Sequence, residues 1–232
     1  MTTIGFDLIS DLNLSPEDNF DWEGKATSLY CIIAGNISDD LRTIKQTLLH
    51  LSKFYQGIFY TLGTLEYSTS EDVEKRTNEL HKICRAIRNV AVMHHHVVII
   101  DGIAVIGANG WYGLFSRDLI IEATLEKNRN EDILYLKNTL ERLQKHLDVK
   151  KVIIVSNSVP SKDLYFGEHP ESINTQLNLS ISLVADSEAK VSHWVYGTYE
   201  KVVDTTINNI NYINNSCFKR NPYWAKRIAI TL

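Results

Sequence analysis

Short apolar runs that each end at a polar loop are the feature that most constrains how this chain folds. One such run ends just before the loop of residues 10–13, and a second, residues 30–34, ends at Gly35. Uninterrupted apolar runs are typical of strands buried on both faces of a sheet. Loops at the carboxyl ends of such strands line the functional crevice of an α/β protein. Asp11 is therefore a candidate ligand or catalyst, although the cap of a turn or helix is the simpler interpretation.

Helical periodicity separates the apolar runs. Apolar residues recur at three- and four-residue intervals between positions 41 and 55, which predicts an amphipathic helix, and a further apolar run over 57–62 ends at Gly63. A second helix is predicted from a capping box at 68–71 to about Asn89. The predicted inner face of a third helix consists of Ile133, Leu136, Leu140, Leu143 and Leu147. The order of strand, helix and strand favours parallel pairing through crossover helices.

The second half of the chain continues the pattern. Asp101-Gly102 between two apolar runs predicts a hairpin over 96–107. The runs at 152–155 and 193–196 each end at another polar loop. Short runs around 202–203, 207–213 and 228–231 are expected to be antiparallel strands. No repeat, linker or change in composition divides the chain, so we expect residues 1–232 to form a single domain.

Composition narrows the class of protein. The formal net charge of the 232 residues is −4, without a block of like charges, which argues against direct binding of nucleic acid. No basic leader and no stretch long enough to span a membrane is evident, so we expect a soluble, cytoplasmic protein. Cys31, Cys84 and Cys217 are widely spaced and lack CxxC pairing, and Cys31 and Cys84 are expected to be buried free thiols.

Five polar loops thus follow five apolar strands in a fixed order, and together they resemble the loops of the calcineurin-like metallophosphoesterases. The marks of that family are Asp-x-His, Gly-Asp, Gly-Asn-His-Asp/Glu, a His-rich turn and Gly-His-x-His. The matching loops here are Asp11-Leu12-Asn13, Gly35-Asn36, Gly63-Thr64-Leu65-Glu66, Ser156-Asn157-Ser158-Val159-Pro160 and Gly197-Thr198-Tyr199-Glu200. Supporting matches are Ile106-Gly107-Ala108, Trp111 and Trp194.

The resemblance spans residues 6 to about 222 and implies a specific architecture. It is an α/β fold, a four-layer α/β/β/α sandwich with two mixed β-sheets face to face and helices outside. The predicted order of strands and helices is compatible with two stacked sheets.

The resemblance also implies a reaction, hydrolysis of phosphoesters by two bridged metal ions, which needs several ligands and a bridging carboxylate. Asp11 is retained, but Asn36 replaces the bridging carboxylate and Leu65 replaces the catalytic histidine. No histidine stands at any matched position. The degenerate site positions are Asp11, Asn13, Asn36, Thr64, Leu65, Asn157, Ser158, Thr198 and Glu200.

Two interpretations of these oxygen-bearing residues stay open. They could hold a single weakly bound Mg²⁺ or Ca²⁺ ion, because hard cations accept oxygen ligands. We favour instead a polar plug in which asparagine and threonine side chains hydrogen-bond to one another, without a metal cofactor. Glu66 and Tyr67 could face the same pocket or lie in a solvated loop. His94 and His96 would share a strand face, although an exposed strand start is the simpler interpretation.

The sequence therefore predicts a protein that is not an enzyme, a pseudoenzyme that serves as a structural or protein-interaction module, with a protein partner or self-association. The alternative is a weak metal-dependent phosphoesterase or a binder of a phosphate-containing ligand in the former cleft. A virion component would be a natural case if the source were viral. The segment from Lys219 to Arg227 mixes cations with aromatic residues and is either a surface segment or a contact for a phosphate or partner.

Overall fold

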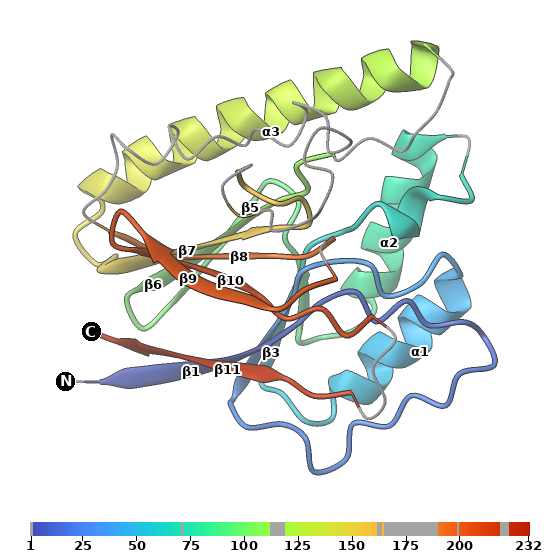
Figure 1. The fold of residues 1–232 in the computed structure, drawn as a ribbon, viewed down its shortest axis with the longest axis horizontal. Coiled ribbons are helices and arrows are strands. Elements are labelled where there is room, and N and C mark those ends of the chain that lie inside the picture. The colour runs from blue at the N-terminus through green and yellow to red at the C-terminus, as the bar shows by residue number, and fades with distance from the viewer. Residues whose placement is uncertain are drawn as a thin grey trace.

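Two mixed β-sheets form the centre of the computed structural model, which describes residues 2–70, 72–111, 119–161, 164, 190–198, 200–218 and 223–232 (Figure 1). The first sheet has the strand order β11-β1-β2-β3-β4. Its strands are β1 (Thr3–Ile9), β2 (Tyr30–Ile33), β3 (Gly57–Tyr60), β4 (Val90–Val92) and β11 (Lys226–Thr231). All neighbours are parallel except β11, which runs antiparallel to β1.

The second sheet has six strands in the order β5-β6-β7-β8-β10-β9. They are β5 (His96–Ile100), β6 (Ile103–Ala108), β7 (Lys151–Ser156), β8 (Val191–Tyr196), β9 (Val203–Ile207) and β10 (Ile210–Asn214). The four central strands are parallel, and β5 and β9 pair antiparallel at the two edges. The carboxyl ends of the parallel strands bring together loops that are far apart in the sequence.

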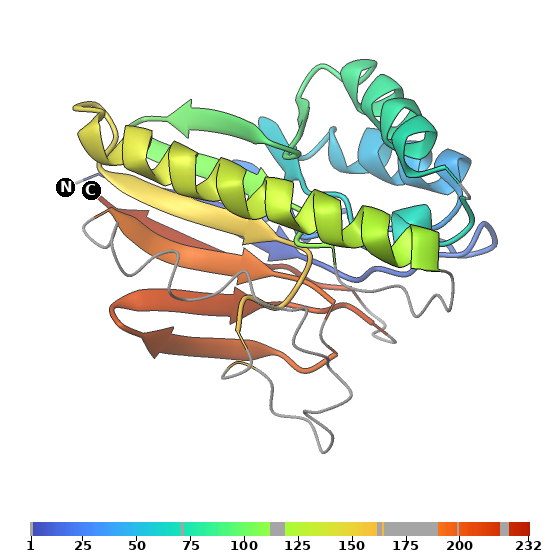
Figure 2. The same ribbon diagram turned by 90° about the horizontal axis from the view of Figure 1, so that it is seen from above.

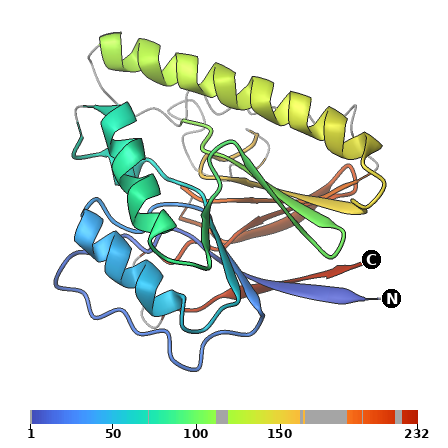
Figure 3. The same ribbon diagram turned by 180° about the vertical axis from the view of Figure 1, so that it is seen from behind.

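Three separate apolar cores define four layers. One core lies between the sheets and includes Phe6, Ile32 and Val155. A second joins the first sheet to α1 (Leu41–Leu51) and α2 (Val73–Arg85), and a third joins the second sheet to α3 (Leu119–Lys145). Figures 2 and 3 show α3 on one side of the paired sheets and α1 with α2 on the other. The predicted α/β/β/α sandwich is therefore confirmed.

Most of the predicted elements are confirmed, including the hairpin at Asp101-Gly102 and the first helix. The predicted segment 207–213 is wrong as a single strand, because Asn208 and Asn209 have left-handed backbones and form the turn between β9 and β10. The short runs around 202–203 and 228–231 lie at β9 and β11, which pair antiparallel as predicted, whereas β10 also pairs parallel with β8.

Both ends of the second and third helices differ from the prediction. The second helix begins after Asp72, whose carboxylate accepts a hydrogen bond from the Lys75 amide at 2.9 Å, and it ends at Arg85. Glu71 of the predicted capping box lies outside the described residues. The third helix starts at Leu119, well before its predicted stripe, and it ends at Lys145, so Leu147 lies beyond it and is 85% exposed.

Other features concern the predicted class of protein. The three cysteines are free and buried, as predicted for Cys31 and Cys84. Within the described ranges, no helix has both the length and the apolar character needed to cross a membrane. Of the segment that mixes cations with aromatic residues, 219–222 lie outside the described residues.

Candidate functional site

Four polar side chains meet where strands of the two sheets end. Asp11 follows β1, Asn36 follows β2, Asn157 follows β7 and Thr198 follows β8. We call these four residues the strand-end cluster. Because parallel strands end at a common edge, each of these loops reaches the same place although the residues are up to 187 positions apart.

Asp11 lies at the centre of the strand-end cluster and is only 4% exposed. Its Oδ1 accepts hydrogen bonds from Asn36 Nδ2 at 2.8 Å and from the Thr198 amide at 2.9 Å. Its Oδ2 accepts one from the Ser10 hydroxyl at 2.9 Å. Burial raises the pKa of Asp11 to about 6, and these hydrogen bonds only partly offset that rise. The carboxylate is therefore already satisfied by protein donors.

The neutral members of the cluster are bonded in the same way. Asn36 Oδ1 accepts from the Leu65 amide at 2.9 Å, and Asn157 Nδ2 donates to the Ala34 carbonyl at 2.9 Å. The Thr198 hydroxyl donates to Asn157 Oδ1 at 2.7 Å, and the Thr64 amide donates to the same oxygen at 3.1 Å. These amide groups hold loops from both sheets against each other.

Two glycines permit this close approach. A Cβ atom on Gly63 would lie 2.2 Å from Asn36 Oδ1 and 2.5 Å from the Asn36 amide nitrogen. A Cβ atom on Gly197 would lie 2.2 Å from the Ala34 carbonyl oxygen. Such distances are far below van der Waals contact, so any side chain at these positions would push the loops apart.

The backbone of the cluster is unusual. Asp11, Asn36 and Thr198 have φ values of 54°, 60° and 58°. Asparagine and aspartate adopt the left-handed region more readily than most residues, whereas for a β-branched threonine it is strained. Thr198 is held there by the hydrogen bonds of its amide and its hydroxyl.

Glu66, for which the sequence left open a place at the pocket or in a solvated loop, is buried and is the main organiser of the neighbouring loops. It is fully buried and accepts hydrogen bonds from the amides of Asn36, Ile37 and Gly63 at 3.0, 2.7 and 2.9 Å. The Tyr60 hydroxyl donates a fourth at 2.7 Å. Burial raises the pKa of Glu66, opposed by these hydrogen bonds. Its sequence signal was its place at the Asp/Glu position of the loop Gly63-Thr64-Leu65-Glu66.

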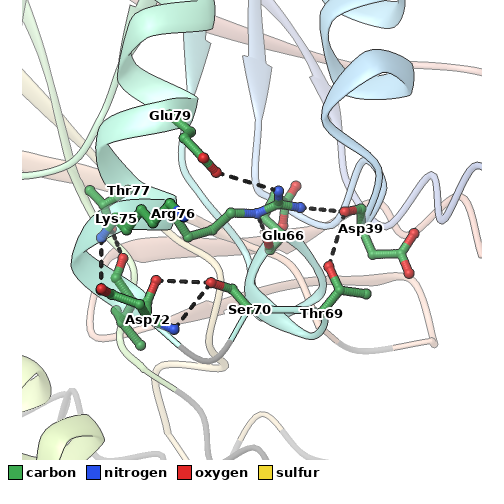
Figure 4. A network of polar contacts seen from close by, with 10 residues as sticks. Asp39, Glu66, Thr69, Ser70, Asp72, Lys75, Arg76, Thr77 and Glu79 are labelled. Carbon is green, nitrogen blue, oxygen red and sulfur yellow. Dashed lines mark hydrogen bonds and ion pairs between the residues drawn. The ribbon is translucent and has the colours of Figure 1, made fainter.

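Arg76 fastens the Glu66 loop to α2 and to the loop after β2 (Figure 4). Its Nε donates to the Glu66 carbonyl at 2.7 Å, and its guanidinium also donates to the Asp39 carbonyl. The Glu79 carboxylate lies 3.9 Å away and partly balances the charge. Arg76 is 7% exposed, so both loops are held by a buried side chain rather than by flexible surface contacts.

The remaining predicted site residues contribute less. Asn13 Nδ2 donates to the Asp11 carbonyl at 3.0 Å, whereas Thr64 and Leu65 join the cluster through their backbone amides. Ser158 is buried, and its hydroxyl has no hydrogen-bond partner within the part of the chain that the structure describes. Glu200 is exposed, and no hydrogen bond joins it to the cluster among the described residues. The structure thus unites Asp11, Asn36, Asn157 and Thr198 and leaves Glu200 apart.

The donor set does not suit a two-metal centre. The cluster has one carboxylate, and both of its oxygens accept hydrogen bonds from the protein. Asn36 turns its NH₂ group, which cannot bind a cation, toward Asp11. Among the described residues, no group of three or more His, Cys, Asp or Glu side chains is arranged to hold a metal ion.

The histidine run also differs from the strand-face interpretation. β5 begins only at His96, and His95 has a left-handed backbone with φ of 49°, so His94 and His96 do not share a strand face. The His94 ring stacks on His95, whose Nε2 lies 2.6 Å from the buried Asp132 carboxylate. Asp132 also accepts the Gly110 amide at 2.7 Å. These contacts tie the turn before β5 to α3.

Comparisons with known proteins find similar solved structures but no similar sequence. No protein-family model and no curated protein sequence matches the chain. The solved structure of the phosphopantetheinyl hydrolase PptH from Mycobacterium tuberculosis matches with a TM-score of 0.64 and 16% identity, over 96% of this chain and 95% of that one. A Staphylococcus aureus protein assigned as a 5′-nucleotidase gives 0.59 and 13%, over 99% of this chain and 51% of that one.

A third solved structure, GAP50, the anchor in the inner membrane complex of Plasmodium, gives a TM-score of 0.54 and 14% identity. That match covers 91% of this chain and 71% of GAP50. All these identities are low, so the likeness concerns the fold. The chain has the two-sheet α/β fold of metallophosphoesterase-type hydrolases.

Proposed function

We propose that this chain is a catalytically inactive metallophosphoesterase-like protein, kept as a structural or protein-interaction module. The observation that carries the proposal is the strand-end cluster, whose Asp11, Asn36, Asn157 and Thr198 side chains are bonded to one another and to backbone groups. Turnover by two metals needs open ligand positions and a bridging carboxylate. Here the bridging position holds Asn36, an amide that is already engaged.

The solved neighbours support the idea that one fold serves both roles. PptH is a hydrolase by its name, whereas GAP50 is described as an anchor. Function resides in sites placed on a fold rather than in the fold itself. In this chain the loops are rigidly joined by Glu66 and Arg76 while the chemistry of the family is replaced, a combination that suits a module retained for its shape.

The second candidate is a weak metal-dependent phosphoesterase or a binder of a phosphate-containing ligand in the same cleft, and it rests on the retained Asp11. A single Mg²⁺ or Ca²⁺ ion would have to displace the donors that Asp11 now accepts. Such binding would make Asp11 indispensable, whereas the hydrogen-bonded cluster makes it replaceable by asparagine.

The deciding experiment compares the wild-type protein with Asp11→Asn after purification with excess Mn²⁺, Zn²⁺ and Mg²⁺. Metal content is measured by elemental analysis, and hydrolysis of a phosphodiester and a phosphomonoester is measured on the same samples. We expect substoichiometric metal, no turnover and no metal-dependent rise in Tm for either protein.

Two other results would point elsewhere. One or two ions per chain, with turnover lost in Asp11→Asn, would contradict the proposal and establish an enzyme. A metal or nucleotide that raises the Tm of the wild type but not of Asp11→Asn, without turnover, would favour the ligand-binding candidate.

A further inference from the structure

The two sheets have four edge strands, and three of them carry features that discourage pairing with another strand. β4 has only three residues, and β11 carries Lys226 and Arg227. β9 carries the exposed Asp204, whose carboxylate lies 2.6 Å from Lys226 Nζ. Short length and charge are common means of keeping a sheet edge unpaired.

β5 is neither as short as β4 nor charged like β9 and β11. Its sequence, HVVII, contains no acidic or basic residue apart from His96, and Ile99 is 44% exposed. In the strand order established by the described residues, β5 pairs only with β6. Figure 2 shows it along the outer margin of its sheet. An uncharged strand of β-branched residues is the kind of segment that pairs readily with another strand.

The hairpin geometry determines which backbone groups face the free edge. The two-residue turn Asp101-Gly102 places Ile100 opposite Ile103. Residues that flank such a turn form a hydrogen-bonded pair, and hydrogen-bonded pairs then alternate along the ladder. Val98, like Ile100, therefore directs its backbone groups to β6, whereas Val97 and Ile99 direct theirs outward.

We propose that β5 pairs antiparallel with β5 of a second copy of this chain, about a two-fold axis at Val98. In this register Val97 faces the partner's Ile99, and Ile99 faces the partner's Val97. The outward N–H and C=O groups of both residues then find partners. The pairing also covers the exposed Ile99 with an aliphatic side chain on the same face.

The ends of the strand make a second copy a better occupant than an unrelated strand. His95 precedes β5 and Asp101 follows it. In this register Asp101 of each copy lies opposite the partner's His95, so a carboxylate meets an imidazole at both ends of the paired strands. A two-fold axis supplies this complementarity automatically, since the same patch serves both sides. The interface uses none of the strand-end cluster and does not depend on the activity of that cluster.

The first test measures molar mass by size-exclusion chromatography with light scattering at tens of micromolar protein. We expect the wild type at twice the 26.5 kDa of one chain. Ile99→Lys places a charge on the edge and should give the mass of one chain. The matched control is Leu49→Lys on α1, where the wild-type leucine is 41% exposed, and it should remain a dimer. Tm should be similar for the two variants at equal dilution.

A wild type of one-chain mass, or an Ile99→Lys variant that stays dimeric, would overturn the proposal. So would equal dissociation of Leu49→Lys, because the effect would then not belong to β5.

The second test examines the register. The three native cysteines are buried, so disulfide formation can be attributed to the introduced cysteine. Val98→Cys should form a disulfide-linked dimer on mild oxidation, because the two copies of residue 98 would form a non-hydrogen-bonded pair with Cα atoms about 4.5 Å apart. Ile100→Cys should not, because its two copies would be about 13 Å apart along the paired strands. Crosslinking at 100 but not at 98, or at neither, would refute this register.

Discussion

Asp11 and Glu66 are both buried carboxylates with raised pKa values, yet the protein uses them differently. Glu66 accepts three backbone amides and the Tyr60 hydroxyl, so its four donors belong largely to the main chain of two loops. Asp11 accepts one backbone amide and the side chains of Asn36 and Ser10. Glu66 thus holds the loops in place, whereas Asp11 joins the side chains of the strand-end cluster.

The difference teaches which of these two acids the surrounding loops can lose. A carboxylate bonded to main-chain amides cannot be replaced by an amide without setting one NH₂ group against other donors. The Ser10 hydroxyl beside Asp11, in contrast, can rotate to accept a hydrogen bond instead of donating one. Glu66 is therefore more constrained than Asp11.

The largest effect is expected where the Glu66 loop approaches Asn36. Gly63→Ala should lower the free energy of unfolding by about 4 kcal/mol or prevent folding, because the new Cβ would overlap the Asn36 backbone. Gly63→Val, like Val at Gly35 or Gly197, should be at least as damaging. The control is Gly24→Ala, with φ of +71° and no atom within 4 Å of the new Cβ, which should cost about 1 kcal/mol. Chemical denaturation measures both, and equal losses would contradict the loop geometry.

The next effect compares isosteric changes at the two acids. Glu66→Gln should lower the free energy of unfolding by about 2–3 kcal/mol at pH 7, because its NH₂ group would face bonded amide donors. Asp11→Asn should cost less than about 1 kcal/mol, since its oxygen keeps two donors and the Ser10 hydroxyl can turn to accept. Equal destabilisation by the two substitutions would contradict the distinction between Glu66, which holds the loops, and Asp11, which does not.

The pH dependence of stability sharpens the same comparison. The pKa of Asp11 is about 6 when folded and 3.8 ordinarily, so between these values the unfolded chain has released a proton that the folded chain retains. The contribution of Asp11 to stability is full below pH 3.8, falls by about 3 kcal/mol up to pH 6 and is constant above it. The free energy of unfolding of the wild type minus that of Asp11→Asn should therefore fall by about 3 kcal/mol between pH 3.8 and pH 6. A flat difference from pH 4 to 7 would refute the raised pKa.

His193 also changes the stability of the protein with pH, so the wild type must be compared with the Asp11→Asn variant rather than measured alone. Burial lowers the pKa of His193 to about 4 from 6.5, so its neutral form is retained on folding and its contribution is lost as the pH falls through this range. As the pH falls, His193 therefore lowers the free energy of unfolding, whereas Asp11 raises it. Subtracting one variant from the wild type cancels the His193 contribution, because both proteins carry it.

The smallest effect concerns the strained backbone of Thr198. Thr198→Ala removes the hydroxyl hydrogen bond but keeps the left-handed backbone, whereas Thr198→Gly removes both the bond and the strain. We expect the glycine variant to have a free energy of unfolding about 1 kcal/mol above that of the alanine variant. Equal values by denaturation would show that no strain is stored at this residue.

Much of the fold could be predicted from the sequence because a strand that is buried on both faces is an uninterrupted apolar run. Runs such as 30–33 and 152–155 are apolar on both faces, and the structure buries them between two layers. The meeting of Asp11, Asn36, Asn157 and Thr198 followed from the order of the loops and the family resemblance. Local turn chemistry at Asp101-Gly102 was equally direct.

What could not be predicted depends on tertiary contacts. The role of Glu66 comes from amides of a loop 30 positions away, and a single acid after a glycine carries no sign of them. His95 leaves the strand conformation because the turn pairs it with Asp132 on α3. Helix boundaries shifted for a related reason, since Asp72 competes successfully with the predicted capping box.

The pairing of β1 with β11 also bears on the order in which the chain folds. Thr3 lies opposite Thr231, so these strands meet only after nearly all the intervening chain has been synthesised. Contacts at such separation close late, because a long loop must first lose its conformational freedom. β1 can pair with β2 soon after synthesis, whereas its other side stays open until β11 arrives. Completion of the first sheet is therefore expected to be a late, slow step in the folding of this protein.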